Sequence, residues 1–352
     1  MATTEVAADW VGPGDRPIRP GVGDFARLIR IQAVGFEGFS FAIGPLLTGV
    51  ELSIIELSLF WLLGILINGY IFALNDFIDL PRDRNNPARA ASPLVSGKIS
   101  PAIALILSIS FPLIAVAVIV AVGWPPTAVV AFAFFLILGA VVNVYQKATD
   151  RPILMDSLFA VTMAAPIPVA AVAYTDRIPA VVWIATVFMF LLALELNSIA
   201  GNLKDLSSDL VTGFRTVAVM LGAKTTPDGH LEPGPRYRRY CVALHGITVA
   251  VGLSGVAVSL RGFAWTDFVV VAICVTVSVV GSRDLYTLLV GSRRPSRRGR
   301  EGYFAAGFIL MTIVIALNAD LSTFLYSMVV LLSWELLFGI RRYRSASVRR
   351  GD

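Results

Sequence analysis

The stretch "NDFIDLPRD" ends a long apolar run with an amide and three carboxylates. Asn75, Asp79 and Asp83 are four residues apart, so on a helix their side chains share one face, and Asp76 is a neighbour on that face. Because a proline clashes with the carbonyl four residues earlier, we expect the helix to kink or end at Pro81 and Asp83 to lie in a loop. Carboxylates gathered at the end of an apolar helix are costly unless a cation neutralises them.

A second row has the same character. Asn202, Asp205 and Asp209 repeat the amide and the four-residue carboxylate spacing at the end of another apolar stretch. One row alone could consist of helix caps and turn formers, whereas two matching rows favour a shared site. Carboxylates that converge in one cavity repel one another and need divalent cations, and ligands that are all oxygen indicate Mg²⁺. Since Mg²⁺ is commonly shared between carboxylates and substrate phosphates, the rows predict a site for a magnesium-bound diphosphate.

Basic residues lie among these acids. Most of them fit the positive charge of inner membrane loops, but a diphosphate needs more positive charge than Mg²⁺ alone arranges around it. Lys98 and Arg215 are the strongest candidates for direct contact with the phosphate groups.

The elements that must position these residues are membrane helices. The 352 residues are 56% hydrophobic and only 15% charged, against about 25% charged in a soluble domain. Apolar stretches near twenty residues, long enough to cross about 30 Å of hydrocarbon, recur along the chain. They predict an all-α polytopic bundle with crossings at roughly 26–50, 54–76, 101–121, 127–146, 153–174, 179–203, 239–259, 265–287, 302–318 and 321–340. Residues 24–342 form the membrane domain, between a disordered tail at 1–23 and a basic tail at 343–352.

The basic residues orient the bundle. With the N-terminus inside, all of the 29 Lys and Arg residues except Arg177 and Arg261 fall on the inner side. Both acidic rows are therefore predicted to face the cytoplasm, in a multi-pass protein of the cell membrane. The net charge of +5 reflects inner loops beside anionic lipid and does not indicate nucleic acid.

Ionisable residues inside the membrane are functional candidates. Glu195 lies seven residues before Asn202 and Asn68 seven before Asn75, so each is expected two helical turns deeper on the face of its row. A carboxylate there could stabilise a carbocation or receive a proton from an acceptor; the alternative is a polar residue that bridges helices. Weaker candidates of the same kind are Glu37, Asn143 and Asp156.

At these residues the sequence resembles the UbiA-type membrane prenyltransferase superfamily. The first motif of that superfamily is matched by Asn75, Asp76, Asp79 and Asp83, and "PLVSGKIS" follows it at 93–100. The second is matched by Asp205, Asp209, Gly213, Arg215 and Thr216. Arg30, Tyr145 and Lys147 resemble further family positions. Two departures are Ser92, where members commonly carry an Arg (Arg89 lies nearby), and ten predicted crossings in place of nine.

The resemblance implies nine to ten helices around a central cavity that is open to the cytoplasm and to lipid. It implies that two Mg²⁺ ions bind an isoprenyl diphosphate and that the allylic cation alkylates an aromatic or other lipophilic acceptor. The expected metal ligands are Asn75, Asp76, Asp79, Asp83, Asp205 and Asp209. The expected catalytic residues are Asp79, Asp83, Asp205, Asp209 and Glu195. The expected substrate-binding residues are Arg30, Asn68, Asn75, Lys98, Tyr145, Lys147, Asn202 and Arg215.

Two other functions remain open from the sequence. Some UbiA-type proteins are terpene cyclases, in which the same allylic cation closes on its own chain. A transporter is a third class, although a transporter does not need two diphosphate-type acidic rows.

Overall fold

The structure is a computed structural model that describes residues 20–86, 89–145, 151–226, 230–260, 262, 264–290, 297–334 and 337. The predicted tail at 1–23 lies outside the described residues up to residue 19, and the tail at 343–352 lies wholly outside them.

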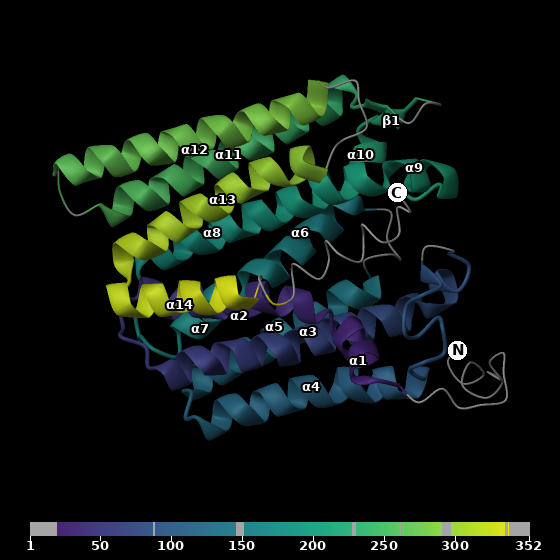
Figure 1. Ribbon diagram of the computed structural model, residues 1–352, viewed down its shortest axis with the longest axis horizontal. Helices are drawn as coiled ribbons and strands as arrows, with labels where there is room; N and C mark the ends of the chain where they lie inside the picture. The colour runs from purple at the N-terminus through teal and green to yellow at the C-terminus, as the bar shows by residue number, and fades with distance from the viewer. Residues whose placement is uncertain are drawn as a thin grey trace.

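Helices make up most of the described chain (Figure 1). In the first half they are α1 (Val22–Leu28), the 3₁₀ turn η1 (Ile31–Ala33), α2 (Val34–Leu47), α3 (Ile54–Asp83), α4 (Pro101–Ala121), α5 (Pro126–Tyr145), α6 (Pro152–Ala164) and α7 (Pro166–Ala171). The second half has α8 (Ala180–Glu195), the π-helical turn η3 (Leu196–Gly201), α9 (Asn202–Thr212), α10 (Val217–Met220), α11 (Pro235–Ser259), α12 (Trp265–Val290), α13 (Arg297–Asn318) and α14 (Leu321–Trp334). Strands β1 (Lys224–Thr225) and β2 (Leu231–Glu232) pair antiparallel.

The predicted polytopic helical bundle is confirmed. Within the described residues, seven helices are long and apolar enough to cross a membrane. Three shorter apolar helices, Ile31–Leu47, Tyr303–Asn318 and Leu321–Trp334, occupy the remaining predicted crossings. Apolar helices thus lie at all ten predicted positions, although these three are shorter than the other seven.

Small residues let the first helices approach closely. A Cβ added at Gly64 of α3 would lie 2.6 Å from the backbone nitrogen of Gly38 in α2. On the same helix α2, a Cβ at Gly44 would collide with the carbonyl of Ile167 in α7. In a membrane, where burial from water no longer drives helix association, such close packing supplies much of the contact energy. α2 is therefore fixed between α3 and α7.

Of the two outcomes expected at Pro81, a kink or an end of the helix, the structure excludes the end. The helix continues to Asp83, and the backbone N–H of Arg84 donates to the carbonyl of Leu80 at 3.1 Å. Proline removes only its own N–H bond, and here the residues that follow it restore the helical pattern for the last turn. Asp83 is therefore held on the helix with Asp79, not in a loop.

Candidate active site

A cavity of about 630 Å³ lies where the end of α3 meets η3 and α9. Residues of both acidic rows line it, together with residues of α6 and of the segment that follows α9. Its wall contains Arg30, Arg82, Asp83, Asn86, Arg89, Pro152, Met155, Asp156, Asn197, Gly201, Asn202, Lys204, Asp205, Ser208, Asp209, Phe214, Arg215 and Thr216. Asp83 of the first row therefore lines the same cavity as Asp205 and Asp209 of the second row.

The first row reaches the cavity through its last member. Asp83 lines the cavity, and its Oδ2 lies 3.6 Å from Nε of Arg89. Asp79 and Asp76 are buried just behind, where Asp79 accepts a hydrogen bond from Nδ2 of Asn75 at 3.1 Å. The row is thus one continuous polar edge of α3, as its four-residue spacing requires.

The second row lines the cavity from α9 with Asp205 and Asp209. Nζ of Lys204 lies 3.7 Å from Oδ1 of Asp205. Gly213 caps the C-terminus of α9 and has a φ of 70°, in the left-handed region that glycine adopts without strain. This turn brings the chain back, so that Phe214, Arg215 and Thr216 also line the cavity.

Arg30, which lies between α1 and η1, also lines the cavity. It is the described non-glycine residue with a positive φ, 50°, a conformation that costs energy and often marks a functional position. Its guanidinium lies 3.3 Å from Oδ1 of Asp76 and 4.0 Å from the centre of the Phe72 ring. The residue remains a cation that contacts the first row.

A smaller cavity of about 180 Å³ adjoins this site. Arg30 lines both cavities, and Asn75 lines the smaller one. The other walls are mostly apolar and come from α3, α5 and α6: Ile71, Phe72, Gly139, Val142, Asn143, Phe159, Thr162 and Met163. A polar compartment and an apolar one therefore lie next to each other.

The donor set of the large cavity fits Mg²⁺. It offers carboxylate and amide oxygens and, among the residues that line it, no His or Cys. In the described part of the chain no three acidic, His or Cys residues lie close enough to hold one ion between them. Carboxylates this close repel one another unless cations lie among them. In this structure the cations are side chains: Arg30, Arg89 and Lys204 contact members of the two rows.

Other predicted residues lie in different places. Arg215 lines the cavity, whereas Nζ of Lys98 lies 3.4 Å from Oδ1 of Asp24 on α1 and Lys98 does not line it. Asn202 lines the cavity, but its amide also holds the backbone: Nδ2 donates to the carbonyl of Asn197 at 2.8 Å and Oδ1 accepts from the N–H of Ala218 at 3.1 Å.

Two further predicted residues do not line the cavity, and a third lies outside the described residues. Tyr145 ends α5 with 58% of its surface exposed, and Lys147 lies outside the described residues. Asn68 is fully buried in α3, lines neither cavity, and neither side-chain polar atom has a hydrogen-bond partner among the described residues.

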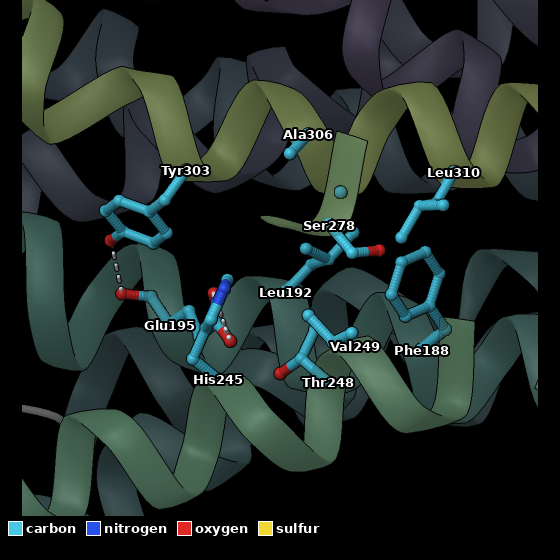
Figure 2. Close-up of a pocket in the computed structure, with 11 residues that line it drawn as sticks. Phe188, Leu192, Glu195, His245, Thr248, Val249, Ser278, Tyr303, Ala306 and Leu310 are labelled. Atoms are coloured by element: carbon cyan, nitrogen blue, oxygen red, sulfur yellow. Dashed lines mark hydrogen bonds and ion pairs between the residues drawn. The ribbon is translucent and has the colours of Figure 1, made fainter. Parts of the chain in front are cut away.

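Glu195 does not lie where its spacing predicts. It is fully buried in a small separate pocket between α8, α11, α12 and α13, and its carboxylate lies 3.3 Å from Nδ1 of His245 (Figure 2). Nε2 of His245 lies 3.2 Å from Oγ of Ser282. The reason is the π-helical turn η3 between Glu195 and Asn202: its i→i+5 pattern turns the chain less per residue, so a seven-residue step no longer returns to the same face.

The same turn brings in a residue that the sequence did not single out. Asn197 lies in η3, lines the large cavity, and its Nδ2 donates to Oδ1 of Asp156 at 2.8 Å. The signal available was an amide within an apolar helix, in "LELNSIAGN". Asp156, a weaker candidate from the sequence, also lines this cavity and not the pocket of Glu195.

The fold and site together define a multi-pass membrane protein with two acidic rows around one cavity. The chain belongs to the UbiA prenyltransferase family, which it matches over residues 39–288. No curated protein matches the chain.

Solved structures share the fold. A digeranylgeranylglyceryl phosphate synthase is 17% identical with a TM-score of 0.61, over 84% of this chain and 96% of that one. A UbiA homologue from Archaeoglobus fulgidus, bound to GPP and Mg²⁺, is 18% identical with a TM-score of 0.59, over 84% of this chain and 99% of that one. A UbiA homologue from Aeropyrum pernix K1 is 18% identical with a TM-score of 0.58, over 81% and 96%. At these identities the likeness is one of fold.

Proposed function

We propose that this protein is a Mg²⁺-dependent prenyltransferase that moves an isoprenyl group from an isoprenyl diphosphate to an aromatic or other lipophilic acceptor. The observation that carries the proposal is one cavity that contains carboxylates of both rows and five basic residues, Arg30, Arg82, Arg89, Lys204 and Arg215. Further support comes from the family and from the homologue of the same fold that is bound to GPP and Mg²⁺.

The acidic rows would hold the metal. Asp83, Asp205 and Asp209 already line the cavity, and Asn75, Asp76 and Asp79 lie behind Asp83 on the same helix edge. Bound there, Mg²⁺, which we expect as two ions, supplies positive charge against the departing diphosphate. To receive metal, Asp76, Asp83 and Asp205 would exchange the basic partners that they contact in this structure.

The basic residues would hold the diphosphate. Arg82, Arg89 and Arg215 line the cavity, and guanidinium groups bind phosphate oxygens with two parallel hydrogen bonds. Negative charge on the diphosphate grows as the bond to the allylic carbon breaks. Cations placed there in advance therefore stabilise the transition state more than the ground state. Arg89 would compensate for the Ser92 departure, since it lines the cavity and contacts Asp83.

The isoprenyl group would occupy the apolar surroundings. The smaller cavity meets the larger one at Arg30 and has aromatic and aliphatic walls from Phe72, Phe159 and Met163. We further propose that the site faces the cytoplasm at the cell membrane, since nearly all basic residues fall on that side of the predicted crossings.

The test is to incubate purified protein with geranyl, farnesyl and geranylgeranyl diphosphates and Mg²⁺, with and without a panel of phenolic and lipid acceptors. Release of diphosphate with a prenylated acceptor supports a transferase. A cyclic hydrocarbon formed without acceptor would replace it by a terpene cyclase, and the absence of diphosphate release from all three substrates would refute both.

A further inference from the structure

We propose that Asp156 is the carboxylate that faces the reacting allylic carbon: it stabilises the cation and receives the proton that the acceptor loses, and Asn197 positions it. The proposal rests on the proposed function and names a residue outside both acidic rows. It also moves to α6 a role that the spacing of the sequence had assigned to Glu195.

Asp156 lies at the polar cavity, on a helix whose same face continues into the apolar cavity. It lies on α6 in the wall of the large cavity, beside Met155. Phe159 and Met163, one and two turns further along the same face of α6, line the smaller apolar cavity. An isoprenyl diphosphate with its phosphates among the two rows and its chain in the apolar cavity would therefore pass Asp156 near its first carbon.

Asp156 is buried, and within the described part of the chain a hydrogen bond satisfies only one of its two carboxylate oxygens. Only 7% of the residue is exposed, and its Oδ1 accepts the 2.8 Å hydrogen bond from Nδ2 of Asn197. Its Oδ2 is buried without a hydrogen-bond partner among the described residues. A buried carboxylate oxygen without a donor is costly, and such an exception calls for an explanation. A transient cation and a transferred proton would each satisfy it.

The position of Asn197 in the helix allows it to hold Asp156. Asn197 reaches Asp156 because it lies in the π-helical turn η3, and single π-helical turns occur frequently at functional sites. The carbonyl of Asn197 also accepts the hydrogen bond from Nδ2 of Asn202. The residue that holds Asp156 is therefore connected to the start of α9, which carries the second acidic row.

One bond breaks and one bond forms at the allylic carbon. The bond between the allylic carbon and the diphosphate oxygen breaks, and its electron pair stays on the diphosphate. An electron pair of the acceptor, or of water when no acceptor is present, forms the new bond to that carbon. The proton that the acceptor or water loses moves to a carboxylate oxygen of Asp156, and nothing is oxidised or reduced.

The test compares two isosteric changes in the full-length protein, Asp156→Asn and Glu195→Gln, with geranylgeranyl diphosphate and Mg²⁺ and with water as the terminal nucleophile. We measure the rate of diphosphate release and, separately, the thermal stabilisation by inorganic pyrophosphate plus Mg²⁺. We expect Asp156→Asn to slow release about 100-fold or more while it keeps the pyrophosphate stabilisation, because it removes a charge that faces the cation and not a ligand of the diphosphate. Glu195→Gln should slow release by less than about threefold.

Asn197→Ala and Asp156→Glu keep the proposal testable if one variant fails to fold. We expect Asn197→Ala to slow release about tenfold in the parent and to have no further effect in the Asp156→Asn background, which a purely structural role would not produce. Asp156→Glu should recover part of the rate.

The proposal is overturned if Asp156→Asn retains release within about threefold, if it loses the pyrophosphate stabilisation, or if Glu195→Gln is the slower of the two. A parent that is stabilised by pyrophosphate and Mg²⁺ but releases no diphosphate from any isoprenyl substrate refutes the proposed function itself.

Discussion

Arg89→Ala should change the binding of Mg²⁺ and of diphosphate in opposite directions. In the structure Nε of Arg89 lies 3.6 Å from Oδ2 of Asp83, so Mg²⁺ must compete with this guanidinium for the carboxylate. The Arg89 side chain is 42% exposed, and a pair this exposed contributes about 0.5–1 kcal/mol. Its removal should therefore tighten the binding of Mg²⁺ alone by about two- to fivefold.

The diphosphate should respond in the other direction. A hydrogen bond between an arginine and a phosphate oxygen contributes about 1.5–3 kcal/mol, so Arg89→Ala should raise the KM for an isoprenyl diphosphate by about 10- to 150-fold. The assays are a Mg²⁺ titration followed by thermal stability and a substrate titration followed by diphosphate release. Arg84→Ala is the matched control, because Arg84 is exposed at the end of the same helix and does not line the cavity.

The opposite signs separate this reasoning from a general defect. A variant that merely distorts the end of α3 would weaken both ligands together. If Arg89→Ala weakens Mg²⁺ and diphosphate equally, or changes neither relative to Arg84→Ala, then Arg89 does not exchange a carboxylate for a phosphate.

Three further predictions test the site and its orientation. Asp79→Ala and Asp209→Ala should each slow turnover about 100-fold or more and abolish the thermal stabilisation by pyrophosphate plus Mg²⁺; if these residues were helix caps, the changes would instead cost about 1 kcal/mol of stability and little rate. Excess EDTA should stop turnover and added Mg²⁺ or Mn²⁺ should restore it, so that full turnover in EDTA would exclude the metal. Cysteines introduced at Arg84 and Thr226, in a version without the two native cysteines, should be labelled only from the inner side of sealed cells; labelling from outside would reverse the topology.

The sequence by itself determined the class of the protein. Apolar stretches near twenty residues must become helices in a bilayer, because every backbone polar group there needs a partner within its own segment. The spacing in "NDFIDLPRD" placed its amide and carboxylates on one edge of α3. These are local properties of helices, and periodicity is enough to read them.

The tertiary structure decided where the deeper residues lie. The seven-residue step that placed Glu195 below Asn202 assumed a continuous α-helix, and the π-helical turn η3 moved Glu195 to His245 and brought Asn197 to Asp156. Lys98 likewise contacts Asp24 of α1, a partner 74 positions away in the chain. These contacts could not be predicted from the amino-acid types. A π-helical turn and the choice of a distant ion partner both depend on how several helices pack together, and not on the spacing within one helix.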